Sequence, residues 1–441
     1  MYRYFYKLLH KYISFYIFPG DKIVEVDPKS TQLLDQFANV TKHSLYLNEQ
    51  NNLQNHEALF RLNDLKYFKP DLLILNGNLH YVRDIQAYLQ ELHGLCENHT
   101  RLVVTYYSIA WRPAMKIATF LRIRKKTPEQ NWIAHEDITN LLYLSDFEVI
   151  KRDNRVLLPF YIPLLSNFLN RYLAPLPFFR LFTMVNILIA RPIPKAEKEL
   201  SDLSVSVIIP AKNEYGNIEN AIIRLPKMGR DDEVIFVEGN STDNTWEKIE
   251  EIKNKYDQKR SIKIAKQEGR GKGDAVRKGF SIATKDILMI LDADLTVPPE
   301  DLTKFQQAII TKKAEFVNGS RLVYPMEKGG MPFLNIIANK FFASAFSYVL
   351  GQPFKDTLCG TKVLSRKDYN RIDKFRSYFG EFDPFGDFDL IFGASRLGLK
   401  IIEVPITYKQ RTYGKTNIQR WKHGIILFRM LFFAARKIKF I

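Results

Sequence analysis

The sequence predicts an α/β protein with two domains. Short apolar runs alternate with helix-like stretches in both halves of the chain, an order that is typical of parallel sheets covered by helices. Between the halves, Pro192 and Pro194 are followed by charged residues, which indicates a linker. We therefore expect one domain at residues 1–190, a linker at 191–202, a second domain at 203–415 and a basic helix at 416–441.

Three apolar runs in the second half predict strands, with a helix between the first two. The strands are expected at residues 204–209, 233–237 and 287–291, and the helix at about residues 217–224. A polar cluster follows each strand: Pro210 to Glu214, Glu238 to Asp243, and Asp292 to Asp294. Ligands of parallel sheets bind outside the carboxyl ends of the strands, so we expect the three clusters to form one pocket.

The triplet Asp292-Ala293-Asp294 places two carboxylates at the end of a strand. Carboxylates in this position can hold Mg²⁺ or Mn²⁺, and such an ion neutralises charge on a departing phosphate. A solvated turn is the alternative, because triplets of this kind also arise by chance. The neighbouring motifs favour the metal site.

Seven motifs follow one another in the second half. They are IIPAKNE (208–214), EGNSTDNT (238–245), GRGKGDA (269–275), LDADLTVPPEDL (291–302), NGSR (318–321), DTLCGTK (356–362) and RTYGKTN (411–417). In this order they resemble the family 2 glycosyltransferases with a GT-A fold, particularly the branch of dolichol-phosphate mannose synthase, from about Ser204 to Ile441. The resemblance implies transfer of a sugar, with inversion, from a nucleotide-sugar donor to an acceptor such as a polyprenyl phosphate or a glycan.

The resemblance also implies roles for single residues. Asp292 and Asp294 are expected to approach the metal, and Arg321 and Arg411 to handle phosphate charge. The expected donor-binding residues are Pro210, Asn213, Glu214, Glu238, Asp243, Lys272, Asp274, Asp292 and Arg411.

Two positions depart from the family pattern. Where the family usually has Asp-Asp-Gly-Ser after the second strand, this chain has Glu238, Gly239 and Asn240, so recognition of the base or ribose is expected to differ. Relatives that transfer to lipid phosphates often carry Gln two residues after the second metal Asp, where this chain has Thr296. A hydroxyl or a water would then complete the metal site.

Two loops are suited to phosphate. In the first, glycines alternate with Arg270 and Lys272, so that backbone N–H groups and cations can both approach an anion. In the second, Arg411 suits bidentate phosphate contacts and Gly414 permits a tight turn. The alternatives are a flexible basic loop and a solvated basic turn. The resemblance favours roles in substrate binding for both.

Several carboxylates lie among aromatic residues between Glu381 and Leu390. An acceptor hydroxyl needs a general base, for which Asp387 is the first candidate and Asp389 the second, whereas a lipid phosphate is already ionised and needs none. Acids at a helix N-terminus are also ordinary caps. With Arg321, these two form the expected catalytic set.

The charge distribution indicates an anionic partner. The formal net charge is +17, no Asp or Glu follows Glu403, and Lys422, Arg429 and Arg436 recur at helical spacing among apolar residues. Such a helix is expected to lie in a membrane interface, although a core helix whose cations reach solvent fits the pattern equally well. A second aromatic, Pro-broken region, residues 156–190, is expected either to rest on lipid or to pack against the second domain.

These patterns predict a cytoplasmic protein bound peripherally to the inner face of the membrane. No segment is long and apolar enough to span a bilayer, and no nucleic-acid recognition motif is found. Two distant cysteines, Cys96 and Cys359, give no disulfide framework and suit a reducing compartment.

The first half predicts its own α/β domain, with strands at residues 21–26, 71–75, 101–106 and 147–150. It resembles the class I methyltransferases, best from Asp71 to Ile150. Where that family has a glycine-rich loop, residues 24–30 read VEVDPKS, and without glycines the backbone cannot easily approach S-adenosylmethionine. We expect a degenerate domain with a structural or regulatory role. The alternatives are an active methyltransferase, which would make the protein bifunctional, and, for the whole chain, a catalytically inactive nucleotide-binding scaffold.

Overall fold

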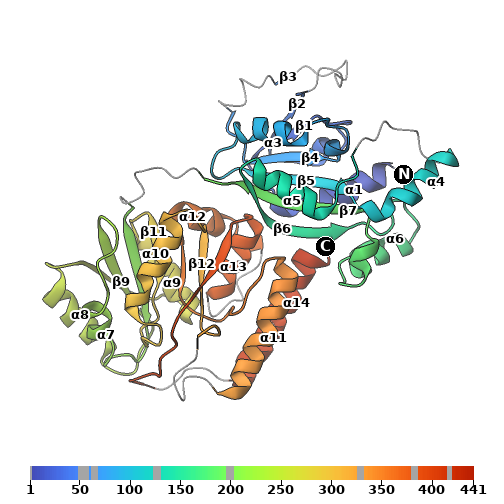
Figure 1. Ribbon diagram of the computed structural model, residues 1–441. Coiled ribbons are helices and arrows are strands. Elements are labelled where there is room, and N and C mark those ends of the chain that lie inside the picture. Colours follow the sequence, from blue (N-terminus) through green and yellow to red (C-terminus); the bar gives the residue numbers. More distant parts are fainter. Residues whose placement is uncertain are drawn as a thin grey trace. The chain divides into compact units, whose positions relative to one another are not determined.

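The computed structural model divides the chain into two compact units (Figure 1). Unit 1 comprises residues 1–195 and 436–441, and unit 2 comprises residues 196–435. The structure describes residues 2–47, 59–60, 68–122, 131–194, 203–324, 332–378, 386–414 and 420–441. Most of the predicted linker lies outside these ranges.

Unit 1 is built on a seven-stranded sheet with the order β3-β2-β1-β4-β5-β7-β6. The first five strands in this order are parallel, and β7 runs antiparallel to both of its neighbours. All four strands predicted in this half are present. The strands are β1 (Lys22–Val26), β2 (Thr41–Leu45), β3 (Leu59–Phe60), β4 (Leu72–Asn76), β5 (Arg101–Tyr107), β6 (Phe147–Arg155) and β7 (Val185–Pro192).

Helices cover both faces of this sheet because its central strands are buried on both sides. Along β4, Leu73 and Leu75 belong to one apolar core, whereas Leu72 and Ile74 belong to the other. The first core includes side chains of α3 and α5, and the second includes side chains of α1. The helices of unit 1 are α1 (Tyr2–Ile13), α3 (Ile85–His93), α4 (Arg112–Phe120), α5 (His135–Leu144) and α6 (Leu165–Phe168).

Unit 2 is built on a second seven-stranded sheet, with the order β10-β9-β8-β11-β13-β12-β14. Strands β8 to β11 are parallel, as predicted, but β13 runs antiparallel to β11 and β12, so the sheet is mixed. The three predicted strands are confirmed as β8, β9 and β11. The strands are β8 (Val205–Ala211), β9 (Asp232–Glu238), β10 (Ser261–Lys266), β11 (Ile287–Ile290), β12 (Phe316–Ser320), β13 (Lys362–Ser365) and β14 (Ile401–Pro405).

The main core of unit 2 joins one face of the sheet to α7, α8 and α10, through residues such as Val207, Ile249 and Phe305. On the other face α9 lies close to β8, where a Cβ on Gly279 would come 2.5 Å from Ile208. The helices are α7 (Ile218–Ile223), α8 (Thr245–Tyr256), α9 (Lys272–Ile282), α10 (Leu302–Ile310), α11 (Phe333–Leu350), α12 (Arg366–Lys374), α13 (Asp387–Arg396) and α14 (Arg420–Ala434). In place of one helix over residues 416–441, α14 is followed by the π-helical turn η11 (Ala435–Lys439).

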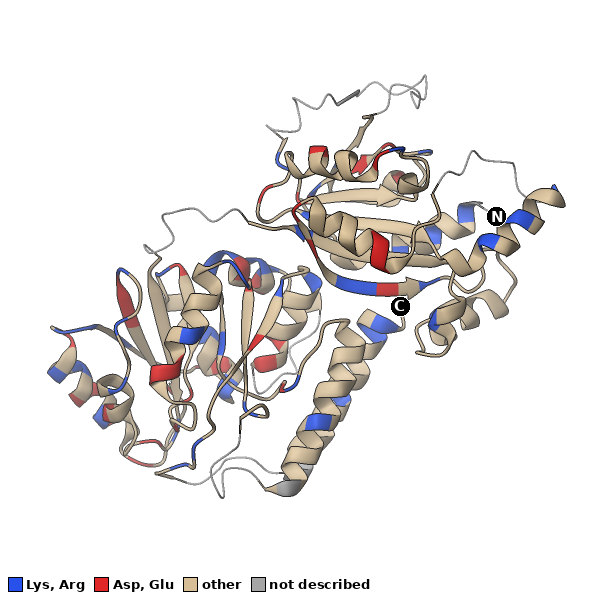
Figure 2. Cartoon of the chain, in the orientation of Figure 1, with Lys and Arg blue, Asp and Glu red and all other residues tan. Residues whose placement is uncertain are grey.

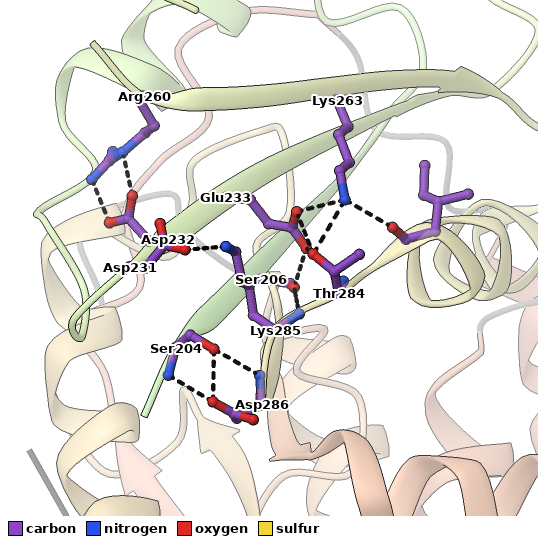
Figure 3. Close-up of polar contacts among 11 residues, drawn as sticks. Ser204, Ser206, Asp231, Asp232, Glu233, Arg260, Lys263, Thr284, Lys285 and Asp286 are labelled. Atoms are coloured by element: carbon purple, nitrogen blue, oxygen red, sulfur yellow. Dashed lines mark hydrogen bonds and ion pairs between the residues drawn. The ribbon is translucent and has the colours of Figure 1, made fainter. Parts of the chain in front are cut away.

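A polar network ties the strands together near the amino ends of β8 and β9 (Figure 3). Glu233 is buried at the start of β9, where its carboxylate accepts hydrogen bonds from the Ser206 hydroxyl at 2.6 Å and the Thr284 amide at 2.7 Å. Lys263 on β10 lies 2.7 Å from the same carboxylate. These contacts satisfy an acid that apolar strands surround.

Within the described ranges, no helix is long and apolar enough to cross a membrane.

Candidate active site

The predicted site residues come together at one edge of the unit 2 sheet. The parallel strands β8, β9 and β11 end there, and β13 begins there because it runs the opposite way. The segments that follow β12 and β14 supply Arg321 and Arg411. Residues that follow β12 and β14, which run in the same direction as β11, therefore join the three polar clusters at this edge.

Asp292 pairs with a lysine from the glycine-rich loop. Its Oδ1 lies 2.5 Å from Nζ of Lys272, the first residue of α9. Burial opposes the charge on both groups, but their mutual attraction outweighs it, so the pKa of Lys272 is raised and the pKa of Asp292 is lowered. Gly271 precedes the helix at φ +86°, a conformation that side chains disfavour. The glycine-rich loop thus places the Lys272 ammonium group at the carboxyl end of β11.

Asp294 and Glu214 share one guanidinium group. Arg411 lies 2.7 Å from Oδ2 of Asp294 and 2.7 Å from Oε1 of Glu214, through its two terminal nitrogens. Burial raises the pKa of Glu214, and the arginine only partly offsets this effect. The Thr296 hydroxyl donates to Asp294 at 2.9 Å, so this residue supports the second carboxylate.

The loops after β8 and β9 are fastened to each other. The Asn213 side-chain oxygen accepts from the Thr242 amide at 2.7 Å, and the Asn213 amide donates to the Ser241 hydroxyl at 3.0 Å. Glu238 accepts from the Ser241 amide at 2.5 Å. Asp243 accepts from the Thr245 amide at 3.1 Å. These contacts hold the two loops together, and Pro210 on β8 lies beside Val237 of β9.

Asp274 holds the glycine-rich loop in shape. Its Oδ2 accepts from the Gly269 amide at 2.6 Å, and a Cβ at Gly269 would lie 2.8 Å from Oδ1. Asp274 therefore stabilises the conformation of the glycine-rich loop.

Asp387 and Asp389 lie on α13 but contact different cations. Asp387 is buried, and its Oδ1 lies 3.1 Å from Nζ of Lys362, which is fully buried. Asp389 lies 3.5 Å from Arg277 of α9, beside a surface pocket lined by residues such as Phe280. The structure therefore separates the two candidate bases.

Arg321 makes a bidentate pair with the buried Asp356. Its Nε and Nη2 donate to the two carboxylate oxygens at 2.7 and 2.8 Å. Burial opposes the charge of Arg321, but Asp356 outweighs it and raises the arginine pKa. The Arg321 guanidinium is thus held in place by a buried carboxylate, and its expected phosphate role stays a prediction.

The sequence predicted no role for two residues of its motifs, Gly360 and Lys362. A Cβ at Gly360 would lie 2.1 Å from both Asp292 Oδ2 and Lys272 Nζ, so a larger residue here would displace this pair. Lys362 is the buried partner of Asp387. Their position in the motif DTLCGTK was the available signal, but the sequence does not show that β13 runs antiparallel and begins at the site.

The carboxylates at this edge form a limited set of oxygen donors for a metal. Among the residues that the structure describes, no cluster of three or more His, Cys, Asp or Glu side chains is placed to hold an ion. Asp292 and Asp294 fit the pattern in which Mg²⁺ uses one or two carboxylates and takes its other ligands from phosphates and water. Residues 379–385 and 415–419, which include Glu381, Asp383, Thr416 and Asn417 of the predicted motifs, lie outside the described ranges.

Comparisons with known proteins address the same unit. Residues 206–373 match the model of the glycosyl transferase family 2. The chain is 29% identical over 223 residues to a dolichol-phosphate mannosyltransferase of Pyrococcus furiosus, covering 49% of this chain and 60% of that protein. It is 29% identical over 252 residues to the dolichyl-phosphate beta-glucosyltransferase of Saccharomyces cerevisiae, covering 50% of this chain and 72% of that protein.

Among solved structures, the chain is similar to glucosyl-3-phosphoglycerate synthase from Mycobacterium tuberculosis, crystallised with Mn²⁺, UDP and glucosyl-3-phosphoglycerate. The identity is 20% and the TM-score 0.40, with 54% of this chain and 80% of that chain covered.

The fold and the family match define a mixed α/β domain of the glycosyltransferase class. More particularly, unit 2 contains a glycosyltransferase family 2 domain, and the named relatives are glycosyltransferases.

Proposed function

We propose that unit 2 transfers a sugar, with inversion and with the help of Mg²⁺ or Mn²⁺, from a nucleotide-sugar donor to a lipid phosphate. The observation that carries this proposal is the pairing of acids with cations at the strand ends. Three cationic side chains, Lys272, Lys362 and Arg411, reach the carboxylates that line the site. These cations can turn from the carboxylates to phosphate oxygens, and a divalent ion would then compensate the carboxylates that they release.

The same pairing favours a phosphate acceptor over a hydroxyl acceptor. A hydroxyl must lose a proton to a base, which adds positive charge to the protein. If Asp387 took up that proton, the buried Lys362 would be left as an uncompensated charge. A lipid phosphate is ionised before it binds and requires no such step. Both named relatives carry a dolichol-phosphate acceptor in their names.

In the proposed donor complex, Asp292 and Asp294 would hold the ion. When bound, the ion would supply positive charge that stabilises the departing nucleoside diphosphate. Lys272 and Arg411 are flexible enough to turn from these carboxylates to phosphate oxygens. The fastened loops at Asn213 and Glu238 would keep the nucleoside wall in place. Preorganisation of this kind lowers the entropic cost of reaching the transition state.

We propose that the protein acts at the cytoplasmic surface of a membrane. Helices α11 and α14 contact each other, with the Phe341 and Phe428 ring centroids 5.8 Å apart. Each helix exposes apolar side chains at spacing i, i+3, i+7, which forms one face on a helix. These are Leu334, Ile337 and Phe341 on α11 and Ile425, Phe428 and Phe432 on α14. The two stripes support the amphipathic role predicted for the C-terminal helix.

For unit 1 we propose a degenerate methyltransferase-like domain with a structural role. The sheet order reverses between β1 and β4, the point at which doubly wound sheets bind ligands. There, Asp27 accepts from the Tyr88 hydroxyl at 2.9 Å and from the Leu47 amide at 2.9 Å. The loop after β1 thus makes its hydrogen bonds to other residues of unit 1. Calorimetric titration of the full chain with S-adenosylmethionine should give no heat of binding, whereas micromolar binding would favour an active methyltransferase.

The donor site can be tested by thermal unfolding with UDP, GDP, CMP and TDP, with and without Mn²⁺. One nucleotide with Mn²⁺ should stabilise the protein by about 2.7 kcal/mol at 100 times its Kd. Asp292→Asn/Asp294→Asn should abolish the metal-dependent part, and Glu251→Gln on the exposed side of α8 should retain it. No shift with any nucleotide would favour the inactive scaffold.

The acceptor can be tested with the identified donor, a polyprenyl phosphate and the matching polyprenol. Transfer to the phosphate alone is expected, because the site would then need no base. Transfer to the alcohol at a comparable rate would contradict the proposed acceptor class.

A further inference from the structure

Unit 1 has an exposed apolar surface that the transferase activity does not use. It extends from η5 (Ile109–Trp111) and α4 to the segment that holds α6, η6 (Leu169–Leu173) and η7 (Phe179–Phe182). Strongly exposed members are Phe120, Leu164, Phe168, Phe178, Leu181 and Phe182. Apolar patches of this kind on a protein surface usually mark an interaction site.

Hydrogen bonds and ring contacts join the parts of this surface. The Trp111 indole N–H donates to the carbonyl oxygen of Phe182 at 2.7 Å, which connects η5 to η7. The Phe178 ring lies 5.6 Å from that of Phe182. Tyr161, before α6, lies 5.4 Å from Tyr4 of α1. In Figure 1, α1, α4 and α6 accordingly lie at the same side of the unit 1 sheet.

Residues 157–170 are folded with polar groups inside and apolar groups outside. The buried Ser166 hydroxyl accepts from the Ile162 amide at 2.7 Å and donates to the Phe160 oxygen at 2.8 Å. The buried Asn170 side chain accepts from the Leu157 and Leu158 amides at 2.8 and 2.9 Å. This is the reverse of the ordinary distribution, in which Ser and Asn face water. The fold itself therefore holds the apolar side chains outward.

Leu164 lies at the tip of this segment in a strained conformation. Its φ is +62°, which a branched side chain rarely adopts, and its side chain is 87% exposed. No burial of the leucine offsets the strain within unit 1. Strain of this kind persists where the surrounding structure imposes it, and it is concentrated at functional positions.

The charge around the surface has one sign. Residues 156–194 contain no Asp or Glu, and they include the partly exposed cations Arg171 and Arg180. On α4 the charged side chains are Arg112 and Lys116, both exposed, and Figure 2 shows this helix without an acid. An anionic lipid surface attracts such cations by about 1 kcal/mol each.

We propose that this surface docks unit 1 on an anionic lipid bilayer, with its aromatic and aliphatic side chains in the interface and its arginines and lysines at the headgroups. Aromatic side chains favour this depth because their rings are amphipathic or polarisable. No membrane-spanning helix is involved. The inference is independent of the proposed transferase, since it concerns unit 1 and requires no catalysis.

The test is co-sedimentation of the full chain with vesicles of phosphatidylcholine alone or with about one third phosphatidylglycerol, whose anionic headgroups attract exposed cations. The variant Leu164→Ser/Phe168→Ser/Phe178→Ser should bind anionic vesicles at least tenfold more weakly than the wild type. Tyr143→Ser/Leu144→Ser, which changes exposed apolar residues of α5 in the same unit, should bind as the wild type. Because all five side chains are exposed, thermal unfolding should show that each variant is folded.

Three results would overturn the proposal. They are equal binding of the triple variant and the wild type, equal binding of the wild type to neutral and anionic vesicles, and a wild-type dimer in light scattering that the triple variant converts to monomer. The last result would assign the surface to a second copy of the chain. Nucleotide-induced stabilisation of the triple variant should remain normal, so loss of docking and loss of donor binding are separable.

Discussion

At the residue scale, Gly360 shows how closely the site is packed around Asp292. A Cβ at this position would collide with the carboxylate and the amine of Lys272, which are side-chain ends and can move. Gly360→Ala should therefore displace the pair while the fold persists. We expect kcat/KM to fall by about 100-fold, because displacement of a reacting group by about 1 Å has this effect.

Gly424→Ala on α14 is the matched control, since a Cβ there meets no atom within 4 Å. It should leave turnover unchanged and, if anything, raise stability by about 0.5–1 kcal/mol. Wild-type kcat/KM in Gly360→Ala, measured with the donor identified by thermal unfolding, would show that the Asp292–Lys272 pair does not bear on donor binding.

A second prediction at this scale concerns Asp387 and Lys362. Removing either alone leaves the other as a buried charge and should cost about 3–5 kcal/mol in urea unfolding. The double variant Lys362→Met/Asp387→Asn removes both charges and should recover most of that stability. If the acceptor is a phosphate, the turnover of the double variant should stay within about tenfold of the wild type. A loss of about 10²–10⁴-fold, together with loss of the acidic limb of the pH–rate profile, would identify Asp387 as a general base.

At the scale of elements, the Glu233 network fastens the amino ends of β8, β9 and β10 (Figure 3). Burial opposes ionisation of Glu233, but the hydrogen bonds from Lys263, Ser206 and Thr284 outweigh it and lower its pKa. A lowered pKa means that the stabilisation is complete above the unfolded-state value, about 4.3, and is lost as the pH falls through the folded-state value.

Glu233→Gln should therefore lower the free energy of unfolding by about 1–3 kcal/mol at pH 7. The difference from wild type should shrink as the pH is lowered below about 4. Urea unfolding at pH 7 and at pH 3.5 measures both values. A difference that is constant with pH would mean that the carboxylate charge does not carry the effect. Glu251→Gln on exposed α8 serves as the control.

At the scale of the whole molecule, the end of the chain belongs to unit 1. Arg155 is buried, and its guanidinium donates to the carbonyl oxygen of Lys439 at 2.6 Å and to that of Ile438 at 3.3 Å. Lys439 in turn lies 3.0 Å from Asp153 of β6. Strand β6 and the last residues therefore form one cluster of charges, which the six residues 436–441 complete.

Deletion of residues 436–441 should destabilise unit 1 by about 3–5 kcal/mol, because it leaves Arg155 and Asp153 with fewer partners in a buried place. Arg436→Ala, at an exposed position of the same segment, should change stability by less than about 0.5 kcal/mol. Differential scanning calorimetry would measure the stability of the deletion variant and of Arg436→Ala. An unchanged transition in the deletion variant would show that the tail is dispensable for unit 1.

Much of the fold was predictable because hydrophobic periodicity is local. Strands β1, β4, β5, β6, β8, β9 and β11 and the helix α7 all follow runs of side chains that can be read along a short window. The reversal of β13 was not predictable, since strand direction depends on which partner the strand finds in space. For the same reason the roles of Gly360 and Lys362 were missed.

The residues of the candidate site were predicted by their place in the motifs, but their contacts were not. Asp389 faces Arg277 and Asp387 faces Lys362, although only one residue separates them in sequence. Helical geometry turns such neighbours to different sides. The expected phosphate role of Arg321 stays a prediction, and the sequence did not indicate its bidentate pair with Asp356.

The sequence by itself determined the α/β class of both halves, the family of the second half, the order of the polar clusters along the chain, and the excess of positive charge. These depend on residue type and spacing. Only the tertiary structure decided which carboxylate meets which cation, which face of residues 157–170 is exposed, and that the last residues complete unit 1. These features depend on contacts between segments that are far apart in the chain. Packing and charge balance decide which of these segments meet, and the spacing of residues along the sequence does not show it.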